Sequence, residues 1–180
     1  MISLLVAYTK KDRVIGSGGK IPWNLPSERR RFKAICAGKK VIMGRKSFDE
    51  IGHALSYCTL VIVSKKMKNA PEGCLLASSF EKAVEICAEK DARWLSLSKP
   101  PLNNAGTLDE SGEEILVAGG GEIYKIALPF AERIYATEIH ADFEGDTFFP
   151  PLLESEWDCK KEESHSDNEI TYDYLTFTRK

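Results

Sequence analysis

EEILVAGGGEIYKIALPFAERIYATEIH, residues 113–140, runs from an apolar segment through three glycines into a helix-like segment, and ends in a second apolar segment. This order predicts a strand, a glycine turn, a helix and a strand. Two strands joined by a helix are typical of a parallel sheet, because a parallel neighbour is reached only through a crossover connection. The stretch therefore indicates an α/β fold.

The rest of the chain repeats this alternation. The first nine residues, MISLLVAYT, form a nearly unbroken apolar run, as expected of a strand buried on both faces. KKDRVIGSGGK, residues 10–20, predicts a loop. Further strands are expected at 39–44, 59–66, 156–163 and 170–180. One helix is expected to begin at Pro26, and two more are expected at 45–52 and 78–90. The pattern predicts one α/β domain with a mainly parallel sheet.

Residues 91–112 read DARWLSLSKPPLNNAGTLDESG. This segment is too long for an ordinary helix-to-strand connection. Their second half is polar and contains glycine and acidic residues. We interpret them as a loop insertion, either a mobile surface loop or, through Trp94 and Leu95, a docking segment.

The composition is that of an ordinary globular protein. The 180 residues carry a net charge of −2, which gives no general reason to expect nucleic acid or a membrane as partner. The five cysteines are an odd number without CxxC spacing, and no signal peptide is recognised, so we expect reduced thiols in the cytoplasm and no metal site. We also expect a monomer.

Three predicted strands end in groups that suit phosphates. Glycines at 119–121 follow one strand, Gly44 to Ser47 follow another, and Ser64 with Lys65 follow a third. Ligands of open α/β sheets bind beyond the carboxyl ends of the strands. The pattern favours a nucleotide with several phosphates, and Arg45 with Ser64 and Lys65 favours NADPH over NADH. Packing glycines in a tight turn are the alternative, and no Rossmann fingerprint is present.

WNLPSERRRFK, residues 23–33, combines one acid with three arginines. Pro26 suits the first turn of a helix, and Glu28, Arg31 and Phe32 then share one face. A carboxylate buried near Trp23 and Phe32 is expected to have a raised pKa. Taken alone, Glu28 is either an ordinary first-turn acid or a ligand-binding group.

Four motifs together carry a family resemblance. VIG…PWNLPSERRRFK, VIMGRKSFDEIG, VAGGGEIY and EGDTFFP, in this order and spacing, closely resemble dihydrofolate reductases over residues 1 to about 90 and 113–180. The resemblance implies an eight-stranded, mainly parallel sheet with an antiparallel C-terminal strand and helices on both faces. It also implies hydride transfer from NADPH to the pterin ring of dihydrofolate.

The resemblance also implies roles for individual residues. Glu28 would bind the pterin's amino group and ring nitrogen, and Trp23 would help hold the water that delivers the proton. The implied substrate pocket comprises Leu5, Val6, Ala7, Ile21, Glu28, Arg29, Phe32, Ile51, Leu55, Ala118, Tyr124 and Thr137, the last bracing Glu28 from behind. The implied cofactor site comprises Ala7, Ile15, Gly16, Gly44, Arg45, Lys46, Ser47, Val63, Ser64, Lys65, Ala118, Gly119, Gly120, Gly121, Glu122, Ile123, Tyr124 and Thr147.

Three positions depart from the family pattern. Cys58 stands where the family has the arginine that binds the carboxylate of the glutamate tail. Arg29 replaces an apolar residue beside the acid, so it either binds that tail carboxylate, binds another anionic group, or is solvated. Glu122 stands where many relatives have a cation near the cofactor.

These departures leave three hypotheses open. The first is an NADPH-dependent dihydrofolate reductase with an altered tail site. The second is a reductase of a dihydropterin that lacks the glutamate tail. The third is a non-catalytic NADPH-binding protein acting through its insertion, and the proton-delivery residues Glu28 and Trp23 count against it.

Overall fold

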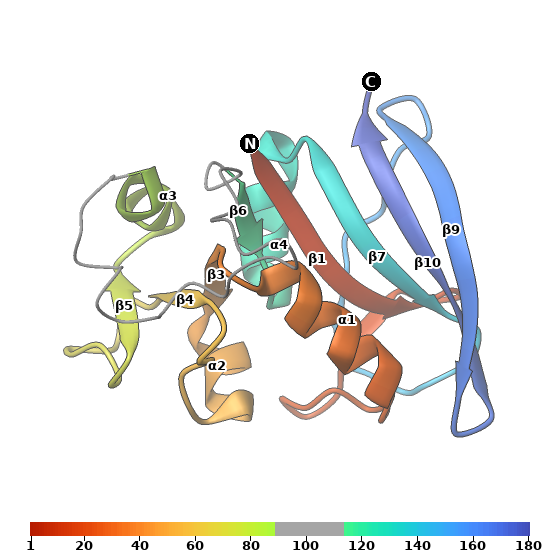
Figure 1. The fold of residues 1–180 in the computed structure, drawn as a ribbon, viewed down its shortest axis with the longest axis horizontal. Helices are drawn as coiled ribbons and strands as arrows, with labels where there is room; N and C mark the ends of the chain where they lie inside the picture. Colours follow the sequence, from red (N-terminus) through yellow and green to blue (C-terminus); the bar gives the residue numbers. More distant parts are fainter. Residues whose placement is uncertain (89–113) are drawn as a thin grey trace, which may run out of the picture.

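A computed structural model describes residues 1–88 and 114–180 of the chain (Figure 1). The predicted insertion at 91–112 lies outside these residues. An eight-stranded sheet forms the centre, in the order β5-β4-β3-β6-β1-β7-β10-β9. Its strands are β1 Ile2–Thr9, β3 Lys40–Gly44, β4 Thr59–Val63, β5 Cys74–Ala77, β6 Ile115–Val117, β7 Arg133–Ile139, β9 Trp157–Asp167 and β10 Ile170–Arg179.

The pairing confirms the predicted sheet. Strands β5, β4, β3, β6, β1 and β7 are parallel to one another, and β10 is antiparallel to both β7 and β9. The unit that spans residues 113–140 is the expected β–α–β crossover, β6 to α4 to β7. The two strands are not neighbours, however, because β1 lies between them. The first nine residues therefore form the centre of the sheet.

Two predictions about strands were incomplete. Residues 10–20 are not wholly a loop, because β2 Val14–Gly16 pairs with β8 Thr147–Phe148 in a second, two-stranded sheet. Strand β5, CLLA at 74–77, was also missed. These strands have two to four residues, too few for a hydrophobic period to identify them.

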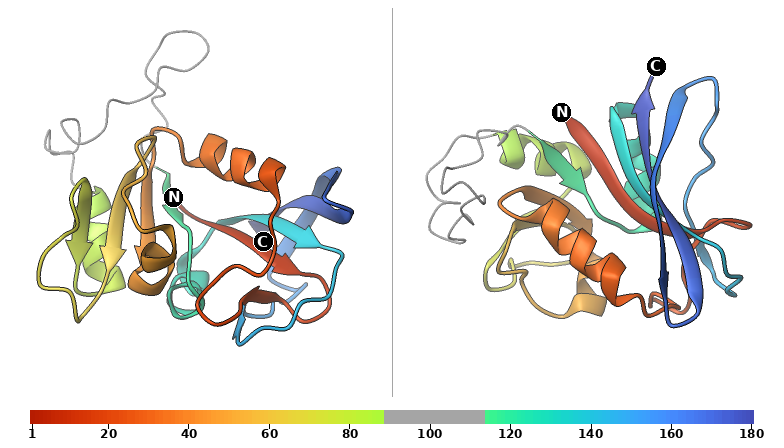
Figure 2. Two further views of the ribbon diagram at one scale, coloured as in Figure 1. Left: turned by 90° about the horizontal axis from the view of Figure 1, so that it is seen from below. Right: turned by 45° about the vertical axis from the view of Figure 1, so that its right-hand side comes forward.

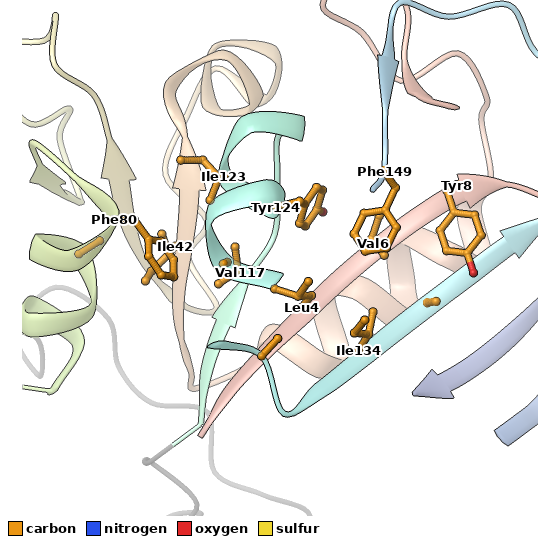
Figure 3. Packing of buried hydrophobic residues seen from close by; sticks show 14 of the residues in the cluster. Leu4, Val6, Tyr8, Ile42, Phe80, Val117, Ile123, Tyr124, Ile134 and Phe149 are labelled. Carbon is orange, nitrogen blue, oxygen red and sulfur yellow. The ribbon is translucent and has the colours of Figure 1, made fainter. Parts of the chain in front are cut away.

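Helices cover both faces of the sheet, as the resemblance implied (Figure 2). The helices are α1 Pro26–Cys36, α2 Arg45–Ile51, α3 Phe80–Ala88 and α4 Gly121–Ala127, the last followed by a short 3-10 helix at Leu128–Phe130. Since side chains of a strand alternate between faces, Leu4, Val6 and Tyr8 of β1 pack with α3 and α4, whereas Leu5 packs with α1 and α2. Figure 3 shows the first of these cores, with Tyr124 of α4 packed edge-on against Phe149. Of the helices in the described residues, none combines the length and apolar character needed to cross a membrane.

Candidate active site

A cleft of about 650 Å³ opens beside α1, at the end of the sheet where the parallel strands finish. Its walls come from β1, the loop before α1, α1 itself, α2 with the following loop, and the glycine turn between β6 and α4. The predicted site residues that line it are Leu5, Val6, Ala7, Ile15, Ile21, Trp23, Glu28, Arg29, Phe32, Ser47, Ile51, Leu55, Ala118, Gly119, Gly120 and Tyr124. Segments far apart in the sequence thus line one cleft.

The first turn of α1 is fixed by the β9–β10 hairpin. The Asp167 carboxylate accepts hydrogen bonds from the Ser27 backbone N–H at 2.7 Å and from the Ser27 hydroxyl at 2.9 Å. An acid at the positive end of a helix satisfies a backbone group that has no partner within the helix. These bonds, donated by the backbone and side chain of Ser27, keep the pKa of Asp167 low. They also fix the position of the neighbouring Glu28.

Glu28 is a half-buried acid facing the cleft. Burial raises its pKa from 4.5 to about 7, and the nearby Arg31 and Arg29 partly oppose this. The expectation of a raised pKa is therefore confirmed. Within the described part of the chain, no hydrogen bond or ion pair holds this carboxylate. An unpaired, partly desolvated carboxylate is costly, so its site is well suited to a ligand that donates hydrogen bonds.

Two basic side chains of α1, Arg29 and Lys33, lie near the rim of the cleft. Arg29 is exposed at the rim, and His53 and Tyr57 line the same cleft from the connection between α2 and β4. Lys33 lies over the Tyr57 ring, 5.4 Å from its centroid. Cys58 is not one of the residues that line the cleft. It is only 3% exposed, and burial raises the pKa of its thiol to about 12. The neutral Cys58 thiol is therefore unsuited to binding an anion.

The loop that precedes α1 is tied to two other segments, the connection between β7 and β8 and helix α2. Trp23 packs edge-on against Phe143, with ring centroids 5.5 Å apart. The Gly18 N–H donates to Asp146 at 2.9 Å, and the Ile21 N–H donates to Glu50 of α2 at 2.6 Å. These contacts hold the loop across one side of the cleft.

The glycine turn lies against the start of α2. The Gly44 N–H donates to the Gly119 carbonyl at 2.7 Å, and the Tyr124 hydroxyl donates to the Leu5 carbonyl at 2.6 Å. A Cβ added to Gly119 or Gly120 would lie 3.0 Å from the Ser47 hydroxyl oxygen. The turn can approach α2 this closely because side chains are absent from it.

Twelve other predicted site residues are not part of the cleft wall. They are Gly16, Gly44, Arg45, Lys46, Val63, Ser64, Lys65, Gly121, Glu122, Ile123, Thr137 and Thr147. Gly44 and Val63 are register partners in β3 and β4, so Arg45 and Ser64 follow adjacent strand ends. Arg45 forms an ion pair with Asp49, and Glu122 forms one with Lys125 at 2.9 Å. Thr137 is fully buried and accepts a hydrogen bond from Arg31.

Sequence reasoning missed five residues of the cleft wall: Leu25, Met43, Glu50, His53 and Tyr57. Met43 was identifiable, because it stands next to the carboxyl end of a predicted parallel strand. The other four belong to loops or to a helix end, where no hydrophobic period indicates which way a side chain points.

A separate group lies on the opposite face of the sheet. Ligand atoms of Glu138, His140 and Asp173 all come within 4.8 Å of one another. Lys10 lies 3.2 Å from the Glu138 carboxylate, and Lys161 lies 2.8 Å from the Asp173 carboxylate. The carboxylates are thus already compensated by lysines, as in an ion-pair network.

Comparisons with known proteins agree with this geometry. The family model described as dihydrofolate reductase matches residues 1–96 and 99–179. The chain is 36% identical to the dihydrofolate reductase of Haemophilus influenzae over 181 residues, covering 99% of this chain and 98% of that protein. It is 33% identical to that of Bacillus subtilis, over 97% and 90% of the two chains.

A solved structure shows the same fold. The dihydrofolate reductase of Enterococcus faecalis, complexed with NADP(H) and RAB-propyl, superimposes with a TM-score of 0.74 and 28% identity, covering 99% of this chain and 96% of that one. Fold, motifs and relatives agree over the length of the chain, and we conclude that the protein belongs to the dihydrofolate reductase family.

Proposed function

We propose that this protein reduces 7,8-dihydrofolate to 5,6,7,8-tetrahydrofolate, with NADPH as the hydride donor, and so supplies one-carbon metabolism. The observation that carries the proposal is the unpaired, half-buried Glu28 in an apolar cleft of a chain from this family. A pterin ring offers an amino group and an adjacent ring nitrogen, which match a carboxylate in a two-point contact.

The residues around the glycine turn fit NADPH. The turn carries no side chains, so a phosphate can approach the backbone at Gly119 to Gly121. Gly44 ends β3 and is followed by Arg45, Lys46 and Ser47, and Ser64 and Lys65 follow β4. The cations and hydroxyls of these residues suit phosphate oxygens. Ile15, Gly16 and Thr147 would complete the site. Thr147 and Ile15 lie close to the turn, because a Cβ added to Gly121 would be 3.0 Å from the Thr147 side chain and 3.9 Å from the Ile15 side chain. Bound NADPH supplies the hydride.

Glu28 and its surroundings would then orient the substrate and deliver the proton. The carboxylate would hold the pterin's amino group and ring nitrogen, while Phe32, Ile51 and Leu55 form an apolar wall along the substrate. The loop carrying Ile21 and Trp23 would exclude bulk water, and Trp23 would help position the one water through which the imine nitrogen is protonated.

The function is tested by following NADPH oxidation with dihydrofolate and, in parallel, with a dihydropterin that lacks the glutamate tail. We expect turnover with both and a higher kcat/KM with dihydrofolate, because Arg29 at the rim of the cleft adds a contact to an anionic tail. A preference for the tail-less pterin would instead favour a pterin reductase. Tight NADPH binding without turnover of either compound would favour a non-catalytic protein.

Arg29 is proposed to bind the tail carboxylate that Cys58 does not bind. It lines the rim of the cleft, and in the described residues no acid pairs with its side chain. Arg29→Ala should raise the KM for dihydrofolate and leave the KM for the tail-less pterin unchanged, because only dihydrofolate carries the tail carboxylate. The increase should be about tenfold, since solvent partly screens a charge at the rim. Steady-state kinetics with both substrates measure this. An equal increase for both would place Arg29 outside the tail site.

We further propose that the protein acts as a monomer in the cytoplasm. All five cysteines are free thiols, as suits a reducing compartment. Neither substrate nor cofactor requires nucleic acid or a membrane.

A further inference from the structure

Arg31 of α1 is held in a fixed position against the sheet. Its guanidinium lies over the Tyr174 ring, with Cζ 4.2 Å from the centroid. Nη1 donates to the Thr137 hydroxyl at 3.3 Å and to the Ala136 carbonyl at 3.5 Å. A long arginine side chain on a helix surface usually extends into water, whereas this one is half-buried and held by β7 and β10. These contacts draw the guanidinium toward the sheet.

Glu28 precedes Arg31 by three residues in α1, so the two side chains share one face of the helix. The two groups also influence each other's ionisation: Arg31 lowers the pKa of Glu28, and Glu28 raises that of Arg31 against the effect of burial. The pair is therefore coupled although no direct hydrogen bond joins it.

The other titratable groups that face Glu28 contribute less charge. Tyr124 of α4, Tyr174 of β10 and Cys36 of α1 are all buried, and burial raises the pKa of each, so they are neutral near pH 7. Arg29 is exposed, so water and salt screen its charge.

Arg31 itself faces three further groups: Tyr174, Tyr135 of β7 and Glu162 of β9. Glu162 forms an ion pair with Lys160 at 2.9 Å, so its charge is already compensated. The half-buried Arg31 is therefore the main charge acting on the Glu28 carboxyl.

We propose that Arg31 is a positioning residue for the reaction: held between Tyr174 and Thr137, its guanidinium favours the charged form of the Glu28 carboxylate. A ligand with a hydrogen-bond donor pair binds a carboxylate and not a neutral carboxylic acid. Arg31 thereby keeps the cleft ready for the pterin at neutral pH. This role rests on the proposed function, but its effect on the carboxyl group is measurable without substrate.

The test is a carbon-13 NMR titration of the Glu28 carboxyl in the ligand-free protein between pH 5 and pH 9. The signal is assigned by its loss in Glu28→Gln. The wild-type midpoint is expected near 7. Arg31→Met should move it upward by about 1 pH unit, because an opposite charge at short range is removed. Arg31→Lys keeps the positive charge, so it should move the Glu28 midpoint by less than about half of the Arg31→Met shift.

The matched control is Arg30→Met. Arg30 neighbours Arg31 on the same helix but is exposed and donates to the Ser27 hydroxyl at 2.7 Å. Its loss should leave the Glu28 midpoint unchanged within about 0.3 pH unit. An Arg31→Met midpoint equal to that of Arg30→Met would overturn the proposal and leave Arg31 as a packing residue.

If Arg31→Met fails to fold, Tyr174→Leu provides a second route. It removes the ring that holds the guanidinium while leaving α1 intact. An upward shift in Tyr174→Leu that exceeds the shift in Arg31→Lys supports the proposal, and a Tyr174→Leu midpoint equal to that of Arg30→Met overturns it.

Activity gives the second readout. In Arg31→Met the pH profile of kcat/KM for dihydrofolate should move in the same direction as the NMR midpoint, whereas a merely structural loss lowers the whole profile. If Glu28→Gln were to retain full activity, the proposed use of Glu28 would fail, but the NMR shift would still decide whether Arg31 controls its charge.

Discussion

Glu28→Gln is expected to lower kcat/KM for dihydrofolate at pH 7 by about 1,000-fold. Glutamine keeps the size of the side chain but replaces a carboxylate, which accepts two hydrogen bonds, with an amide that accepts at one atom and donates at the other. The pterin's adjacent donors then meet a donor of the same kind. Both orientation of the ring and delivery of the proton should suffer, so kcat falls as well as kcat/KM.

Stopped-flow and steady-state NADPH oxidation measure this loss, and fluorescence titration measures NADPH binding. Glu50→Gln is the matched control, since Glu50 also lines the cleft but uses its carboxylate to accept the Ile21 N–H at 2.6 Å. A glutamine oxygen can accept the same bond, so activity should fall less than about tenfold. Near-wild-type turnover in Glu28→Gln would rule out Glu28 as the substrate-binding acid.

The same variant should be more stable than the wild type above pH 7. Burial raises the folded-state pKa of Glu28 from 4.5 to about 7, so the carboxyl's contribution to stability is fully present below 4.5 and is lost as pH rises through 7. Glutamine has no charge to desolvate. Urea unfolding should show equal pH trends below 4.5 and an advantage of about 2 kcal/mol for Glu28→Gln at pH 8. The variant's lost activity would then not reflect a lost fold.

The fold was predictable where elements were long enough to show a period. The apolar first nine residues and the 113–140 unit identified a parallel sheet, and the antiparallel β10 was identified by its alternation. The strand order was not predictable from local pattern, because β1 enters between β6 and β7 from a distant part of the chain. The β2–β8 pair depends on contacts between short segments about 130 residues apart, which a local pattern does not encode.

The site was predictable through its motifs more than through its charges. Glu28, Phe32 and the glycine turn were recognised from spacing and resemblance, and the structure brings them to one cleft. The three arginines have the same side chain in the sequence but three different environments in the fold. Arg29 meets the cleft rim, Arg30 meets the Ser27 hydroxyl and solvent, and Arg31 meets Tyr174 and Thr137. Only tertiary packing distinguishes them, because the β7 and β10 partners of Arg31 are more than 100 residues away.

Gly119→Ala should lower the affinity for NADPH by about 100-fold. Gly119 has φ of +119°, which side chains rarely tolerate, and its added Cβ would lie 3.0 Å from the Ser47 hydroxyl oxygen and 3.5 Å from the Ser47 Cβ. To relieve the strained φ and the short contact with the Ser47 hydroxyl oxygen, the turn must move away from α2. This movement would break the hydrogen bond from the Gly44 N–H to the Gly119 carbonyl. The cleft wall from residue 118 to 120 would then lose the surface that faces the cofactor.

Fluorescence titration with NADPH measures the affinity, and Gly73→Ala separates cofactor binding from general strain. Gly73 has φ of +73°, and its added Cβ would lie 3.0 Å from the Ala54 Cβ, so the backbone and steric costs are of the same kind. It lies outside the cleft wall. Both variants should lose about 2 kcal/mol of unfolding free energy, but only Gly119→Ala should lose NADPH affinity. Equal losses of NADPH affinity in the two variants would mean that the turn acts through stability alone. An unchanged affinity in Gly119→Ala would place the cofactor elsewhere, because a ligand bound to this turn must be affected when the backbone of the turn moves.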